Sequence, residues 1–169
     1  DEDYGLFQED GAGIHFPLPF LGYMEVGRVV ESRAASVPEG QLVAMAYGHK
    51  SGHTADVQNE FFVPLPAGLD PLLGIYVAQM GPICVNALLH AAAELVGPDV
   101  RSLGDGVRGR NVVVFGAGVI GLLTALLARE HGAAEVVVVN SEGPRLAAAR
   151  SLGLQALNQH TEPAPWLVC

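Results

Sequence analysis

The strongest constraint on the fold is a run of seventeen uncharged residues, VVVFGAGVIGLLTALLA, from Val112 to Ala128. A membrane-spanning helix needs roughly 20 apolar residues and usually has Lys and Arg gathered near one end. This run is shorter, carries three glycines inside it, and has no cluster of Lys and Arg at either end. It opens with four β-favouring residues, so we expect a buried strand, a glycine turn and a helix rather than a membrane span.

The glycines follow the pattern G-x-G-x-x-G, and the context of this motif gives it meaning. It follows the predicted strand 112–115, it opens a predicted helix that runs from about Val119 to His131, and a second Val-rich strand follows at 135–140. Such a strand–helix–strand unit presents backbone N–H groups to the phosphates of a dinucleotide. The alternative is a glycine turn that binds nothing. The predicted cofactor-binding residues of the motif are Gly116, Ala117, Gly118, Val119, Ile120 and Gly121.

The end of the second strand bears on which dinucleotide is bound. An acidic side chain there would hydrogen-bond the adenine ribose of NAD, whereas this chain has Asn140 and then Ser141. Neither side chain would repel a 2′-phosphate, and Arg145 could pair with one. These three residues favour NADP over NAD. Two alternatives stay open: Asn140 can still bond a ribose hydroxyl, and Arg145 can be a solvated surface residue.

The first part of the chain has the sequence pattern of a β domain: short runs of alternating apolar and polar residues, broken by Gly and Pro. We expect strands within 25–32 and 41–47, joined by the turn Val37–Gly40. A third strand is expected within 60–66, where Pro64 should end the strand or confine it to a sheet edge.

Helical and strand signals then alternate to the end of the chain. Asp70-Pro71 suits a helix start, and the helical pattern extends to about Glu94. Gly81-Pro82 should kink this helix or split it in two. The polar, glycine-rich residues 96–110 read as a connecting loop. After them come the elements named above, then a helix at about 144–152 ended by Gly153, and two weaker strands at 155–158 and 166–169. Continuous Val runs favour a parallel sheet buried on both faces.

Composition limits the function classes. The formal net charge of −9 disfavours a nucleic-acid partner, because nucleic-acid phosphates require a basic surface. The two cysteines, Cys84 and Cys169, form no CxxC pair, and no signal peptide opens the chain. We therefore expect a cytoplasmic protein, and the Ala-, Arg- and Val-rich composition suggests a bacterial source.

Two segments together resemble the medium-chain dehydrogenase/reductase superfamily. They are FLGYMEVGRVVES…VPEGQLVAMA and, much later, NVVVFGAGVIGLLTALLAREHGAAEVVVVNSEGPRLAAARSLG. The resemblance implies an α/β protein: a partial GroES-like β domain over residues 1–75, connecting helices and a loop over 76–110, and the first half of a doubly wound Rossmann domain over 111–169. Superfamily members are longer, so we expect the chain to be part of a larger protein, which the resemblance implies is a homodimer or homotetramer.

The same resemblance implies hydride transfer between a nicotinamide cofactor and a small alcohol, ketone or enone. Zinc-dependent members carry Gly-His-Glu where this chain has Gly22-Tyr23-Met24, and neither Tyr nor Met is a good zinc ligand there. Gly81 stands where some members have a ligand carboxylate, and we interpret the nearby Cys84 as a buried helix residue. The four-cysteine structural zinc loop is absent. These departures predict the zinc-free branch, with NADP preferred or NAD as cofactor and no metal.

Without zinc, another group must protonate or polarise the substrate oxygen. The resemblance implies that the segment YGHKSGH, residues 47–53, follows a strand that borders the substrate cleft, and that Tyr23 faces the same cleft. We predict His49 first and Tyr23 second as catalytic residues, although a loop histidine can equally be solvated. His49 and His53 are poor candidates for a metal pair, because Gly48 and Gly52 disfavour the helix that would align them.

Two other functions stay open. One is a zinc-dependent alcohol or polyol dehydrogenase whose remaining ligands lie outside these 169 residues. The other is a non-catalytic protein that uses a Rossmann domain to sense nucleotides or to assemble, since a fold alone does not fix a function.

Overall fold

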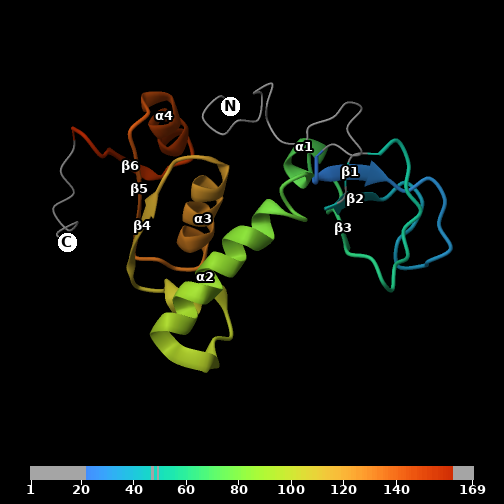
Figure 1. Cartoon of the computed structure of the whole chain (residues 1–169), viewed down its shortest axis with the longest axis horizontal. Helices are drawn as coiled ribbons and strands as arrows, with labels where there is room; N and C mark the ends of the chain where they lie inside the picture. Colours follow the sequence, from blue (N-terminus) through green and yellow to red (C-terminus); the bar gives the residue numbers. More distant parts are fainter. Residues whose placement is uncertain (1–21, 47, 49, 162–169) are drawn as a thin grey trace, which may run out of the picture. The chain divides into compact units, whose positions relative to one another are not determined.

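The computed structural model describes residues 22–46, 48 and 50–161 of the chain. The predicted strand at 166–169 and the predicted catalytic residue His49 lie outside the described residues. The chain folds as two compact units, residues 1–79 and residues 80–169 (Figure 1). The boundary therefore falls just before the long helix α2, which belongs to the second unit.

The first unit contains a three-stranded antiparallel sheet in the order β1-β2-β3. The strands are β1 (Glu25–Arg28), β2 (Leu42–Met45) and β3 (Phe62–Pro64), each inside a predicted run but shorter. Gly40 in the β1–β2 connection has φ +82°, which favours glycine. β3 is an edge strand and ends at Pro64, as the missing N–H of proline predicts.

Alternation along β2 builds a small core on each face of this sheet. Val43 and Met45 pack with Val37 on one face, while Ala44 packs with Leu65 on the other. This is the period of two that a strand imposes on its side chains. Among the described residues, each face of this sheet therefore carries a cluster of three buried hydrophobic residues.

The helical pattern after Asp70 is split in two, but the break lies at residues 75–79, before the predicted position at Gly81-Pro82. α1 (Pro71–Gly74) is a single turn, and the Asp70 carboxylate caps it by accepting from Leu72 N at 2.9 Å. α2 (Met80–Val96) begins after an irregular turn, so Pro82 lies in its first turn, where it breaks no helical hydrogen bond.

The second unit holds a parallel sheet in the order β4-β5-β6. Its strands are β4 (Asn111–Phe115), β5 (Glu135–Asn140) and β6 (Gln155–Asn158). α3 (Val119–Glu130) connects β4 to β5, and α4 (Gly143–Ser151) connects β5 to β6. Gly132 and Gly153 follow these helices with φ of +93° and +71°, which confirms their predicted role as helix stops.

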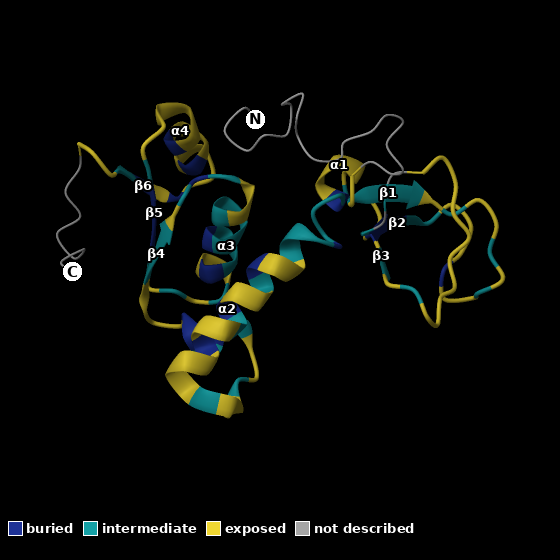
Figure 2. Cartoon of the chain, in the orientation of Figure 1, coloured by how far each residue is buried: buried dark blue, intermediate teal, exposed yellow. Residues whose placement is uncertain are grey.

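Burial differs between the two Val-rich strands. Val136–Val139 of β5 are all buried, because β5 is the central strand. β4 is an edge strand in the described chain, and its valines are only partly buried (Figure 2). The prediction that both Val-rich strands are buried on both faces of the sheet is therefore confirmed for β5 and wrong for β4 in the described chain. The core of this unit lies between the sheet and the helices, around Val138, Ala125 and Ala149.

Residues 96–110 differ from the predicted loop. They contain two short 3-10 helices, η2 (Gly97–Asp99) and η3 (Leu103–Gly106). Gly104 and Gly106 are buried, and a Cβ on Gly106 would press on the backbone of Ala92 in α2 at 2.9 Å. Gly106, one of the glycines that indicated a loop, instead allows close packing against α2.

Membrane crossing has to be considered for one helical segment of the described chain. Residues Met80–Asp99 are long and apolar enough by length and composition alone. One such segment is weak evidence for a membrane span, because core helices of soluble proteins pass the same test. Only 17% of the segment is buried, with Cys84, Leu88 and Ala92 as the buried residues of α2. The stretch 112–128 that raised the question in the sequence folds as strand β4, a glycine turn and helix α3.

Candidate functional site

The glycine turn after β4 has the geometry that the motif predicts. Gly116 has φ +98°, which disfavours residues with a side chain, and its N–H donates to Val139 O on the neighbouring strand at 2.8 Å. A Cβ on Gly121 would collide with the carbonyl oxygen of Gly116. The first turn of α3 is therefore packed directly against the end of β4, as expected for the third glycine of the motif.

The middle glycine, Gly118, faces open space. A Cβ built there meets nothing within 4 Å, and Gly118 is the N-cap of α3 with no side-chain capping bond. The first N–H groups of any helix lack intrahelical partners and carry a partial positive charge. This corner thus combines an open backbone surface with unfilled donors, which suits an anionic group such as a pyrophosphate.

Asn140 connects the end of β5 to this turn. Its Oδ1 accepts a hydrogen bond from Ala117 N at 3.3 Å, while its Nδ2 is buried and has no hydrogen-bond partner among the described residues. An unpaired buried donor costs free energy, of order 1–3 kcal/mol. A ribose hydroxyl would satisfy Nδ2, so the residues at this corner fit a dinucleotide.

The residues after Asn140 support the predicted preference for a 2′-phosphate less clearly. Arg145 Nε lies 2.9 Å from Glu142 Oε2, and both side chains are more than half exposed. Sequence reasoning overlooked Glu142, although its i,i+3 spacing from Arg145 is a known helix pairing. Ser141 is exposed, and its carbonyl oxygen accepts from Asn158 Nδ2 at 3.5 Å. A 2′-phosphate would therefore compete with Glu142 for Arg145.

Cys84 is confirmed as a buried helix residue. It has no exposed surface, and its Sγ donates to Ile120 O of α3 at 3.5 Å. The cysteine therefore helps to pack α2 against α3, the helix that carries the glycine motif.

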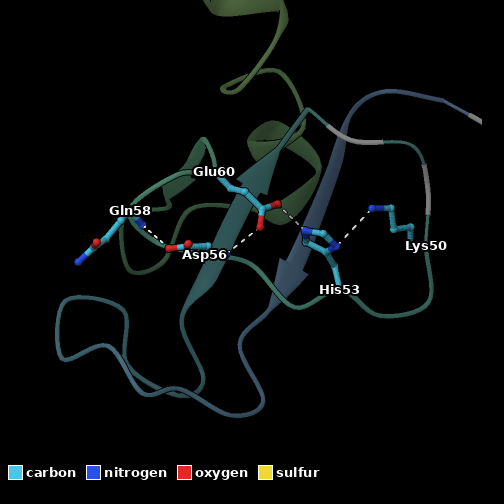
Figure 3. A network of polar contacts seen from close by, with 5 residues as sticks. All are labelled: Lys50, His53, Asp56, Gln58 and Glu60. Carbon is cyan, nitrogen blue, oxygen red and sulfur yellow. Dashed lines mark hydrogen bonds and ion pairs between the residues drawn. The ribbon is translucent and has the colours of Figure 1, made fainter.

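The first unit contributes a separate group of polar side chains. Tyr23 is 53% exposed, whereas the preferred catalytic candidate, His49, lies outside the described residues. His53 is joined to Glu60, with Nε2 to Oε2 at 2.7 Å, and to Lys50, with Nδ1 to Nζ at 3.2 Å (Figure 3). No pattern in the sequence indicated the pairing of His53 with Glu60 seven residues later. Within the described residues, no three His, Cys, Asp or Glu side chains gather where they could hold a metal ion.

The chain was compared with family profiles and with curated proteins. No known family profile matches it. It is 43% identical over 76 residues to D-altritol 5-dehydrogenase of Agrobacterium fabrum, covering 44% of this chain and 23% of that protein. It is also 40% identical over 57 residues to sorbitol dehydrogenase of Macaca fascicularis, covering 34% of this chain and 16% of that protein.

Solved structures match over more of the chain. L-idonate 5-dehydrogenase of Escherichia coli has a TM-score of 0.59 at 20% identity, covering 85% of this chain and 47% of that one. Quinone oxidoreductase of Escherichia coli, solved with NADPH, has a TM-score of 0.57 at 19% identity, covering 94% and 45%. The chain thus spans about half the length of these structures and less of its curated relatives.

An antiparallel sheet followed by a parallel sheet with a glycine turn matches the partial GroES-like and Rossmann parts of an α/β fold. This fold and the sequence matches to polyol dehydrogenases agree with the resemblance to the medium-chain dehydrogenase/reductase superfamily.

Proposed function

We propose that the second unit binds NAD(P) and that the protein is an oxidoreductase acting on a small alcohol or carbonyl compound. The observation that carries this proposal is the corner formed by Gly116–Gly121 and Asn140, where an open backbone and an unpaired buried donor meet. When bound, the cofactor would supply a hydride acceptor or donor at its nicotinamide ring. The relatives named as sorbitol and D-altritol dehydrogenases favour a polyol substrate, while the quinone oxidoreductase keeps enones and quinones open.

Zinc independence is part of the proposal. Tyr23 and Met24 replace the expected His and Glu, and no described group of side chains suits a metal. The competing proposal is a zinc-dependent polyol dehydrogenase with ligands outside the described residues, which the similarity to polyol dehydrogenases favours. Under the zinc-free proposal, Tyr23 and His49 remain the candidate groups for protonating the substrate oxygen.

The preference for NADP rests on Asn140, Ser141 and Arg145. No carboxylate lies at the end of β5 itself, and the solved quinone oxidoreductase with a similar fold holds NADPH. Glu142 weakens this preference because it already pairs with Arg145. An exposed pair of this kind is worth only about 0–1 kcal/mol, so a doubly charged phosphate can displace it. We also propose a small-molecule substrate, a cytoplasmic location, and a homodimer or homotetramer.

The test is a fluorescence titration of the intact protein with NADPH and NADH, with zinc measured on the same sample. Tighter binding of NADPH by a zinc-free protein, with turnover on a panel of polyols and enones, is the expected result. Stoichiometric zinc would favour the zinc-dependent proposal. Nucleotide binding without any turnover would favour a sensor, and no binding would refute the proposal.

A further inference from the structure

The carboxyl ends of β5 and β6 lie side by side within the second unit (Figure 1). Asn140 and Asn158, the last residues of these strands, are paired in register. The Gln159 N–H donates to Asn140 O at 3.2 Å. Asn158 Nδ2 donates to Ser141 O at 3.5 Å. The segment after β6 is therefore bonded directly to Asn140 and Ser141, two residues of the proposed nucleotide site.

A tight turn follows β6 and fixes where its residues lie. The Thr161 N–H donates to Asn158 O at 3.2 Å, which closes a four-residue turn over residues 158–161. The Asn158 side chain stabilises the same turn, because its Oδ1 accepts from His160 N at 2.9 Å. The turn therefore holds Gln159 and His160 next to the end of β5.

The side chain of His160 has a defined hydrogen-bonding direction. Its Nε2 lies 3.1 Å from Gln159 Nε2, an amide nitrogen that can only donate. The imidazole Nε2 therefore accepts, and the ring hydrogen lies on Nδ1. His160 is exposed, and no described residue is hydrogen-bonded to its Nδ1. The ring thus presents an N–H donor to a ligand at this edge of the sheet.

The groups beside this turn favour one kind of ligand group. Asn140 Oδ1 already accepts from Ala117 N, so the amide of Asn140 has only its buried Nδ2 donor to offer. In a dinucleotide site the end of the second strand faces the adenine ribose. Donors from Asn140 and His160 therefore lie near the place of the ribose 2′-oxygen. A 2′-phosphate is negatively charged and offers several acceptor oxygens, so it suits these donors better than a 2′-hydroxyl, which must also place its own hydrogen.

We propose that His160 is a specificity-determining residue that donates through Nδ1 to the 2′-phosphate of NADP, and that Gln159 is its positioning residue. This inference rests on the proposed nucleotide-binding function and involves only the second unit. It gives the phosphate a partner besides Arg145, whose guanidinium is already paired with Glu142. The chemical group that the turn recognises is a phosphate monoester on the ribose 2′-oxygen. NAD has a hydroxyl there and gains little from His160.

The test compares three variants of the intact protein: His160→Ala, Gln159→Ala and His90→Ala. His90 is the matched control, because it is an exposed histidine of the same unit that lies on α2 rather than at the carboxyl end of a strand. Fluorescence titration would give the affinity of each variant for NADPH and for NADH. The ¹⁵N shifts of the histidine rings would report the tautomer, and the ³¹P shift of bound NADPH would report the surroundings of its 2′-phosphate.

We expect His160→Ala to lower NADPH affinity by about tenfold with NADH affinity unchanged, because the lost hydrogen bond is made to a charged group. The ³¹P signal of the bound 2′-phosphate should move in this variant and stay in place in His90→Ala. Gln159→Ala should weaken NADPH binding less than His160→Ala and should populate the Nε2–H tautomer of His160.

Three results would overturn the inference and leave nucleotide binding intact. The first is a His160→Ala protein whose NADPH affinity is within about twofold of wild type. The second is an equal loss of NADPH and NADH affinity in that variant. The third is an Nε2–H tautomer of His160 in the nucleotide-free wild type. A wild-type protein that binds neither nucleotide would instead refute the proposed function.

Discussion

Replacing Gly121 or Gly118 by alanine should separate the structural role of the glycine motif from its binding role. A methyl group on Gly121 collides with the carbonyl oxygen of Gly116, and backbone atoms cannot rotate away as a flexible side chain could. Inserting a carbon into such a packed site costs about 1–3 kcal/mol. For a domain of 60–100 residues, each kcal/mol lowers Tm by about 4–8 °C, so G121A should lower Tm by several degrees or more.

Gly118 is the matched control, because the same methyl group there meets nothing within 4 Å and φ is −83°. Alanine reduces unfolded-state entropy by about 0.4–1 kcal/mol but is a poorer N-cap, so the stability of G118A should stay within about 1 kcal/mol of wild type. Its methyl group occupies the surface where a pyrophosphate would approach, so NADPH affinity should fall by about tenfold or more.

The assays are thermal unfolding and fluorescence titration with NADPH on the same three proteins. Equal Tm values for G121A and wild type would refute the packing argument. Unchanged NADPH affinity in G118A would mean that the pyrophosphate does not lie at this turn.

Two further changes test residues around the site, and a third tests Asp105 in η3. Asn140→Asp keeps the acceptor for Ala117 N–H but brings a negative charge, so NADPH affinity should fall about tenfold or more while NADH affinity is kept, as measured by titration. Glu142→Gln frees Arg145 from an exposed pair worth about 0–1 kcal/mol, so NADPH affinity should rise by no more than about fivefold; a fall would mean that Glu142 itself binds the ribose. The Ser102 hydroxyl, and after it the Arg101 N–H, hold the pKa of Asp105 below its ordinary value of 3.8. Its contribution to stability is therefore present above that pH and lost as the pH falls through the lowered value, so the Tm difference between wild type and Asp105→Asn should shrink on acidification.

Local sequence signals predicted most helices, strands and turns of the second unit, because each of these signals depends only on neighbouring residues in the chain. The φ of +98° at Gly116 and the helix stop at Gly132 follow from residues within a few positions. Contacts between residues far apart in the chain could not be predicted from the sequence. The bond from Ala117 to Asn140 joins residues that the sheet brings together, and the partial burial of β4 depends on its place at the edge.

The first unit shows the same division. The turn at Asp70 and the end of β3 at Pro64 follow from local chemistry. The contact of His53 with Glu60 depends instead on how the loop closes on itself, which no residue pattern specifies. For the same reason the residue pattern of 96–110 predicts a loop, although Gly106 is buried against α2.

The most direct test of the central claim is hydrogen–deuterium exchange on the intact protein with and without saturating NADPH. If the dinucleotide lies at the corner of β4, α3 and β5, amides in residues 116–122 and 140–145 should exchange more slowly when NADPH is bound. Exchange in the β1–β2 sheet should serve as the reference within each sample. Unchanged exchange at residues 116–122 in a sample that demonstrably binds NADPH would contradict the assignment of the glycine turn as the nucleotide site.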